Sequence, residues 1–173
     1  RINNLVNEIL DVSTIESKVY ELKMETLNVR AILEELIENY RYFIEQKNIR
    51  LSSEIANISA RLNRVYLTQI FDNLLSNAVK FTPEEKSIYV QLAEKDGIII
   101  FSIRDEGPGI SQDKIHQVFD QYNRQTSMKD QELVQEGLGL AIVSKYTSAM
   151  KGKVSCESEP GKGSKFIVEL PSA

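Results

Sequence analysis

A narrow seam of apolar residues runs through the first 20 residues of the chain. Its members recur at helical spacing and are Ile2, Leu5, Ile9 and Val12. So narrow a seam is typical of a helix that packs against a partner helix. An ordinary first helix that packs on its own domain is the alternative interpretation.

Two broader apolar stripes, in residues 29–47 and 65–80, predict helices that bury one face against a core. Asn28 is a suitable N-cap for the first helix. Thr82 and Pro83 follow the second and end it, because a residue before proline avoids helical geometry.

Alternating or β-branched apolar stretches predict strands around these helices. They are residues 19–27, 49–55, 58–62, 87–94, 98–103, 153–158 and 164–170. Asp96 and Gly97 predict a hairpin turn. The stretch 98–103 is almost continuously apolar, which predicts a central strand buried on both faces.

The part of the chain between the central strand and the last hairpin is largely polar. Ser111 opens a short helix, and residues 120–136 show little periodicity, so we expect a long loop there. Gly137, Leu138 and Gly139 then open a further helix.

Charge and cysteine content exclude several kinds of site. A net charge of -4 gives no basic excess of the kind that binds nucleic acid. The single cysteine, Cys156, can form no internal disulfide and belongs to no zinc-binding cluster. No apolar run approaches the roughly 20 residues that span a bilayer. The chain begins with Arg1 inside a predicted helix, so we expect a cytoplasmic part of a longer, membrane-anchored protein.

Three polar residues form a stripe along the predicted helix 65–80. Asn73, Asn77 and Lys80 stand at positions i, i+4 and i+7 and therefore share one side. The amide oxygen of Asn77 can coordinate Mg²⁺, which prefers oxygen ligands, and Lys80 can offset phosphate charge. Taken alone, such a stripe is more commonly a solvated face.

Two glycine motifs carry further chemistry. Asp105 ends the predicted central strand and precedes Gly107 and Gly109. A carboxylate there can accept the amine of adenine, and glycines let the backbone approach a flat ring. Gly137 and Gly139 at a helix N-terminus offer amides to phosphate oxygens. Without a ligand, the first motif is an ordinary strand-to-helix turn, and the second lacks the third glycine of a dinucleotide fingerprint.

In order and spacing, these segments resemble the catalytic domain of sensor histidine kinases. The resemblance covers nearly the whole chain, except residues 48–63, which match loosely. The similar segments are the N-box at 69–82 (QIFDNLLSNAVKFT), the G1 box at 105–110 (DEGPGI), the F-box at 118–124 (VFDQYNR), the G2 box at 136–143 (EGLGLAIV), the closing hairpin at 152–171 and the end of the second dimerisation helix at 1–17.

The resemblance implies a fold of the α+β class, the two-layer α/β sandwich known as the Bergerat ATP-binding fold. A mixed sheet of about five strands would carry three helices on one face and follow an N-terminal helix. Residues 1–20 would be the C-terminal part of dimerisation helix 2. Residues 21–173 would be the catalytic ATP-binding domain, with residues 120–136 as its ATP lid.

The resemblance also implies roles for single residues in a site for ATP and Mg²⁺. Asn77 would coordinate the metal, and Asp105 would bind the adenine amine. Asn73, Lys80 and Arg124 would act at the phosphates and are the expected catalytic residues. The other expected nucleotide contacts are Gly107, Gly109, Phe119, Tyr122, Gly137, Leu138 and Gly139.

The implied function is transfer of the γ-phosphate of ATP to a histidine on a dimerisation helix of the same or the partner subunit. The full-length protein would be a homodimer and would pass the phosphoryl group to the receiver domain of a response regulator. The only histidine, His116, is followed by no acidic residue and is interpreted as a surface residue of a short helix. The acceptor histidine is therefore expected outside this sequence. Cys156 is interpreted as a core strand residue.

Five positions depart from the family pattern. Glu106 stands where Asn is usual and is expected to add charge near the nucleotide. Tyr122 replaces a Phe of the F-box, and Gln135 replaces a Gly before the G2 box. Asn63 and Arg64 replace the usual Asp-Pro that precedes the N-box helix.

Three alternatives remain open. Another ATPase of the same fold, of the chaperone, gyrase or mismatch-repair type, does not explain the dimerisation-helix segment 1–17. A non-catalytic interaction module that kept the fold does not explain why Asn77, Asp105 and the glycine pairs are present. A plain dimerisation protein explains only the first 20 residues.

Overall fold

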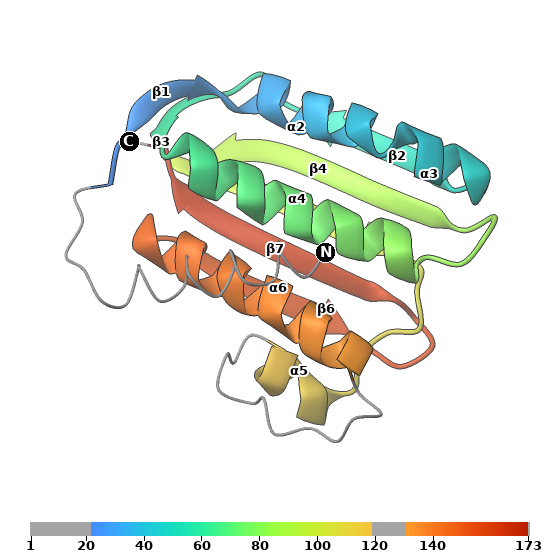
Figure 1. Ribbon diagram of the computed structural model, residues 1–173. Coiled ribbons are helices and arrows are strands. Elements are labelled where there is room, and N and C mark those ends of the chain that lie inside the picture. The colour runs from blue at the N-terminus through green and yellow to red at the C-terminus, as the bar shows by residue number, and fades with distance from the viewer. Residues whose placement is uncertain (1–21, 119–130, 173) are drawn as a thin grey trace.

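The computed structural model describes residues 22–118 and 131–172, and of residues 116–118 and 131–138 only the backbone. Figure 1 shows a sheet with helices side by side on one face. In chain order the elements are β1 (Glu25–Asn28), α2 (Val29–Asn39), α3 (Arg41–Gln46), β2 (Arg50–Ile55), β3 (Ser59–Leu62), α4 (Arg64–Phe81), β4 (Ser87–Lys95), β5 (Ile98–Asp105), α5 (Gln112–Val118), α6 (Gln131–Ala149), β6 (Lys153–Ser158) and β7 (Ser164–Pro171).

The main sheet has five strands in the order β2-β4-β5-β7-β6. Strand β2 runs parallel to β4, and the other neighbours are antiparallel, so the sheet is mixed as predicted. Strand β5 lies at its centre, also as predicted. β1 and β3 form a separate antiparallel pair. The predicted two-layer arrangement, with helices on one face of a mixed sheet, is confirmed.

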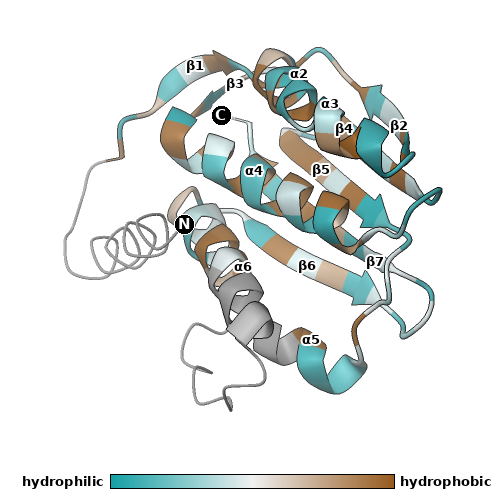
Figure 2. Cartoon of the chain, turned by 45° about the vertical axis from the view of Figure 1, so that its right-hand side comes forward, coloured by the Kyte–Doolittle hydropathy of each residue, from teal (hydrophilic) through white to brown (hydrophobic). Residues whose placement is uncertain are grey.

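The prediction that the central strand is buried on both faces is correct for one face only. That face carries Ile99, Phe101 and Ile103, all buried. On the opposite face Ser102 is buried, whereas Ile98 and Arg104 are exposed. The cause is the single helical layer, which covers only one face of the sheet (Figure 1). Figure 2 shows apolar and polar residues alternating along β6, the strand at one edge of the sheet.

Helix α4 lies between α2 and α6 and supplies the centre of the core (Figure 1). Its first N–H groups are capped by Asn63, whose Oδ1 accepts from the amide of Tyr66 at 2.9 Å. The helix ends at Phe81, as the Thr82-Pro83 pair predicts. The buried side chains are Leu67, Ile70, Phe71, Leu74, Leu75, Ala78 and Val79, the stripe expected from the sequence.

The predicted helix 29–47 is two helices, α2 and α3, separated at Tyr40. The amide of Tyr40 bonds to the carbonyl of Ile37, which tightens the last turn of α2. The Tyr40 hydroxyl donates to Asp72 Oδ1 of α4 at 2.6 Å. Burial, with this hydrogen bond, raises the pKa of the Tyr40 hydroxyl. The interruption thus aims a tyrosine at the neighbouring helix.

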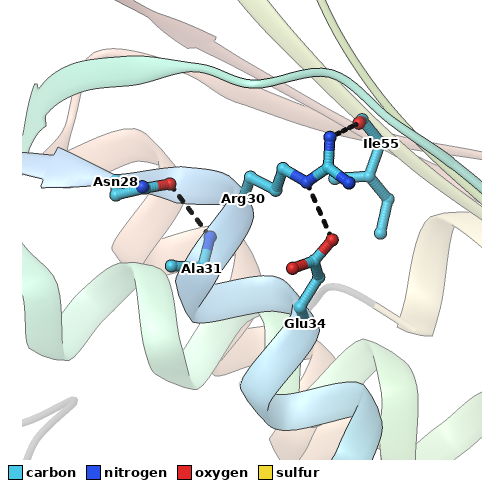
Figure 3. A network of polar contacts seen from close by, with 5 residues as sticks. All are labelled: Asn28, Arg30, Ala31, Glu34 and Ile55. Atoms are coloured by element: carbon cyan, nitrogen blue, oxygen red, sulfur yellow. Dashed lines mark hydrogen bonds and ion pairs between the residues drawn. The ribbon is translucent and has the colours of Figure 1, made fainter.

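Polar contacts fix the start of α2, as drawn in Figure 3. Asn28 Oδ1 caps the helix by accepting from the amide of Ala31 at 3.0 Å, as predicted. Arg30 donates to Glu34 at 2.8 Å and to the carbonyl of Ile55 at 3.1 Å, which joins α2 to the end of β2.

Helix α6 begins at Gln131, six positions before Gly137, so the expected opening at Gly137 is wrong. Part of the expected loop 120–136 is therefore helical. Residues 131–136 include Gln, Glu and Leu, which are good helix formers. The expected helix in residues 1–20 lies outside the described residues.

Replacement of Tyr40 by Phe is expected to lower the free energy of unfolding by about 1–2 kcal/mol, because the partly buried Asp72 carboxylate loses its donor. Chemical denaturation measures this change. Tyr42→Phe is the matched control, since Tyr42 on α3 is 65% exposed. Equal stability of both variants would contradict the contribution assigned to the Tyr40–Asp72 bond.

Candidate functional site

The polar stripe of α4 lies along the side of the helix that faces α6. Asn73 Nδ2 donates to the carbonyl of Gln69 at 2.8 Å, which orients the amide of Asn73. A Cβ placed on Gly139 of α6 would lie 3.3 Å from Asn73 Oδ1. Asn77 stands one turn further on and is half-buried. The structure therefore brings Asn73 and Gly139 together, two of the residues expected at the phosphates.

The last turn of α4 adds a charge and an aromatic ring to this side. Lys80 is exposed, and its Nζ lies 5.7 Å from the centroid of the Phe81 ring. Lys47 Nζ donates to the carbonyls of Val79 and Lys80, at 2.8 and 3.2 Å. A cation at a helix C-terminus stabilises its unpaired carbonyls, so Lys47 fixes the turn that carries Lys80 and Phe81.

Asp105, at the end of β5, is a buried carboxylate with incomplete hydrogen bonding. It is 6% exposed, and its Oδ1 accepts from the amide of Gly107 at 2.8 Å. The amide of Ser164 donates a second bond. Burial raises the pKa of the Asp105 carboxyl, and these two bonds partly offset the effect. An ionised carboxylate accepts about four hydrogen bonds, so Asp105 has capacity for a further donor.

Gly107 joins the end of β5 to the end of α4. A Cβ at this position would lie 2.9 Å from the carbonyl oxygen of Phe81 and 2.8 Å from Asp105 Oδ1. Only glycine allows this approach. Thr82, beside Phe81, is completely buried, and its hydroxyl has no partner among the described residues. A polar ligand or water is what such a hydroxyl requires.

The turn between β6 and β7 braces the loop after Asp105. The amide of Gly161 donates to the carbonyl of Pro108 at 2.7 Å, and the amide of Ile110 donates to Ser158 Oγ at 2.7 Å. Gly109 has φ +77°, and a Cβ there would lie 2.0 Å from the carbonyl oxygen of Glu159. The loop conformation therefore depends on a turn about 50 residues away in the chain. Sequence reasoning missed Ser158 because nothing local marks its partner.

Phe81 was also missed. Its position before Thr82 suggested only the end of a helix, whereas its carbonyl lies against Gly107 and its half-buried ring lies beside Lys80. The available signal was an aromatic residue that directly follows the polar positions Asn77 and Lys80 in the N-box.

The expectation that Glu106 adds charge near the nucleotide stays a prediction, and its contacts show where the carboxylate lies. Its Oε2 accepts from the amide of Ser87 at 3.0 Å, and its Oε1 lies 3.5 Å from the hydroxyl of Tyr89. Both partners belong to β4. The carboxylate of Glu106 is thus engaged with the neighbouring strand and not with Asp105.

Cys156 lies on β6 and packs against the core, as predicted. Burial, with the negative charges of Asp105 and Glu157, raises the pKa of the Cys156 thiol to about 12. A thiol that stays protonated is a poor nucleophile. His116 lies within the short helix α5, as expected, although its side chain is not among those described.

Several expected site residues lie beyond what the structure describes. Phe119, Tyr122 and Arg124 fall in the segment 119–130. Of Gly137 and Leu138 only the helical backbone is described. Because α6 begins at Gln131, the amide of Gly137 lies inside a helix and not at its first turn.

Within residues 22–115 and 139–172, no three His, Cys, Asp or Glu side chains gather as metal ligands. Mg²⁺ needs few protein ligands when phosphate oxygens and waters complete its shell, so an amide such as Asn77 suits a nucleotide-bound Mg²⁺. No helix in the described part of the chain is long and apolar enough to cross a membrane.

Two sensor histidine kinases are similar to this chain over nearly its whole length. The sensor histidine kinase RcsC of Escherichia coli is 33% identical over 170 residues, which cover 96% of this chain and 18% of RcsC. The sensor histidine kinase WalK of Bacillus subtilis is 28% identical over 175 residues, 99% of this chain and 28% of WalK. The chain thus spans less than a third of the length of these two relatives.

Solved structures share the fold. Full-length ShkA in complex with AMPPNP matches with a TM-score of 0.84 and 29% identity, over 98% of this chain and 35% of that one. The catalytic domain of the histidine kinase ThkA matches with a TM-score of 0.75 and 23% identity, over 87% of this chain and 97% of that one. The second match concerns the fold alone.

The family model of histidine kinase-, DNA gyrase B- and HSP90-like ATPases matches residues 62–173, which hold α4, the Asp105 loop and the glycines of α6. This match covers more than half of the chain, and the chain belongs to that family of ATPases.

Proposed function

We propose that the chain is the ATP-binding catalytic domain of a sensor histidine kinase. The observation that carries the proposal is the buried Asp105 carboxylate, which keeps acceptor capacity beside the close contact of Gly107 with Phe81. The similarity to RcsC and WalK supports the histidine-kinase branch of the family. We further propose that residues 1–20 are the end of a dimerisation helix and residues 21–173 the catalytic domain.

The base of ATP would lie between α4 and the loop after β5. Asp105 would accept a hydrogen bond from the exocyclic amine of adenine, and Gly107 and Gly109 would let the ring approach the backbone. Phe81 offers a half-buried ring on which a base can stack. The AMPPNP complex of the similar ShkA supports nucleotide binding by this fold.

The phosphates would lie along the stripe of α4. Mg²⁺ bound with ATP would neutralise phosphate charge, and Asn77 would supply an amide oxygen to it. Asn73 and Lys80 would act at the phosphates, and Arg124, Phe119 and Tyr122 would contribute from the segment after α5.

Gly137, Leu138 and Gly139 would contact phosphate through backbone amides only if residues 131–136 leave the helix. Gly137 is inside α6 here, where its amide is expected to bond within the helix. Each glycine in a helix interior costs about 1 kcal/mol relative to alanine, so the two glycines mark the point where α6 shortens most readily.

The chain's contribution to catalysis would be positioning and charge stabilisation, which account for most of phosphoryl-transfer catalysis. The attacking imidazole would come from a histidine outside these 173 residues, on a dimerisation helix of the same or the partner subunit of a homodimer. The phosphoryl group would then pass to an aspartate of a response-regulator receiver domain. We propose that this domain is cytoplasmic and that the whole protein is anchored in the membrane.

Asp105→Asn is expected to weaken ADP binding about 100-fold, because the new amide N–H groups oppose the adenine amine at a buried position. Calorimetric titration measures the dissociation constant. Glu106→Gln is the matched control: the neighbouring carboxylate bonds to Ser87, and a glutamine oxygen can replace it, so binding should change less than about twofold. Equal losses in both variants would contradict the assigned role, and absence of binding by the wild type would favour a non-catalytic module.

Asn77→Ala is expected to abolish the gain in ATP-analogue affinity that Mg²⁺ provides, while binding without Mg²⁺ stays within about threefold. The same titration, with Mg²⁺ or with a chelator, measures both values. Asn39→Ala, at an exposed position near the end of α2, is the control. A Mg²⁺ effect of unchanged size in Asn77→Ala would remove this residue from the metal site.

The chain alone is expected to acquire no phosphate on histidine when incubated with radioactive ATP, because its only histidine, His116, is in α5 and has no acidic neighbour after it. Acid-labile label mapped to His116 by mass spectrometry would contradict the split mechanism. Substantial steady-state hydrolysis of ATP by the chain would instead favour another ATPase of the family.

A further inference from the structure

Two consecutive residues, the N-cap and the first residue of α4, bind the segment that leads into β1 and the first residue of that strand. Asn63 Oδ1 caps α4, and Asn63 Nδ2 donates to the carbonyl of Lys23 at 3.0 Å. Arg64 Nε lies 3.1 Å from Glu25 Oε1. Both side chains therefore end on residues 23–25, and we call these two contacts the linker anchor.

The linker anchor depends on the side chains present at these two positions. An aspartate at position 63 could cap α4 but has no hydrogen to donate to Lys23. A proline at position 64 would suit the first helical turn but could form no ion pair. Both contacts thus come from the positions where this chain departs from the Asp-Pro of the family pattern.

Strand pairing holds the same segment from the side. β1 pairs with β3 from Glu25 opposite Leu62 to Asn28 opposite Ser59. Leu27 and Leu62 are fully buried, so this pair belongs to the core. β3 leads directly into Asn63, and Figure 1 shows β1 and β3 at the N-terminal end of α4. Two elements therefore hold the segment 23–28: β3 pairs with it, and the start of α4 contacts it through the linker anchor.

Helix α4 then runs without interruption from the linker anchor to the nucleotide site. Arg64 and Lys80 are 16 residues apart in it, which corresponds to roughly 24 Å at 1.5 Å per residue. The helix is capped at its start and packed in the core along its length. A displacement of the segment 23–25 must therefore move α4 as a body or break the linker anchor.

We propose that Asn63 and Arg64 are positioning residues, which fix the first residues of the catalytic domain, where the dimerisation helix joins it, to the nucleotide-binding helix. This inference rests on the proposed function, because it concerns the path from an upstream acceptor helix to the γ-phosphate. Asn63 is the stronger of the two, since the Arg64–Glu25 pair is 58% and 40% exposed and surface ion pairs contribute little alone. Neither residue touches the nucleotide site, so each acts through α4.

Hydrogen exchange in this chain tests the linker anchor itself. Asn63→Asp and Asn63→Ser both keep a capping oxygen, and only the first adds a charge. Combined with Arg64→Gln, each is expected to speed amide exchange in residues 22–28 about fivefold or more. Arg41→Gln is the matched control, because it breaks a similar exposed ion pair, with Glu38, far from the linker. Exchange in residues 22–28 that stays at the wild-type rate in both double variants overturns the linker anchor.

Kinetics separate positioning from mere stability. The double variants are expected to bind ADP within about twofold of the wild type, because the nucleotide site is unchanged. In the kinase that includes the acceptor histidine, their rate of phosphotransfer to that histidine should fall roughly tenfold, since misplaced reactants lose effective concentration. Faster exchange with an unchanged phosphotransfer rate overturns the positioning role. A wild-type chain that fails to bind ADP overturns the proposed function instead, while the exchange experiment still decides the linker anchor.

Discussion

The contact between Phe71 of α4 and Phe101 of β5 is the interaction on which the candidate site depends. The two ring centroids are 4.6 Å apart and the rings are tilted by 48°. Both residues are almost fully buried, so the helix with the polar stripe is fixed on the strand that ends in Asp105. A second pair, Tyr66 of α4 stacked on Tyr146 of α6 at 4.2 Å, sets the distance between the two helices. Aromatic packing thus determines where the polar groups stand.

Regular burial of side chains explains why α4 and β5 could be predicted from the sequence. The break between α2 and α3 lacked such a signal. The apolar stripe of α4 is visible as periodicity, and Asp96 and Gly97 mark the turn between β4 and β5. The bounds of these three elements lie within about two residues of the prediction. The break at Tyr40 leaves no signal in the sequence, because the apolar spacing of α2 continues across it. Isoleucines on the exposed face of β5 misled the burial prediction, since apolar side chains are common on protein surfaces.

In the candidate site, too, some features could be predicted from the sequence and others could not. Asp105, Gly107 and the stripe of α4 could be found from the order of motifs, because each group is close in sequence to the others that define its motif. The brace that Ser158 gives to the loop, and the position of the Phe81 carbonyl against Gly107, join segments from different parts of the chain. Residue type alone does not name the partner in such contacts: a glycine or a serine in the sequence does not say which distant segment it will meet. Tertiary packing was needed to reveal them.

The departures from the family pattern remove no group that the proposed nucleotide site needs. This favours a kinase over a module that only kept the fold. Glu106 bonds to β4, where its carboxylate accepts from the amide of Ser87. Asn63 keeps the capping role of an aspartate and adds a donor. Asp105 meanwhile remains buried with a raised pKa and unused acceptor capacity, an arrangement that costs stability unless a ligand repays it. The bonds from Gly107 and Ser164 leave part of that acceptor capacity unused, and a nucleotide amine would use it, so the carboxylate favours a working nucleotide site.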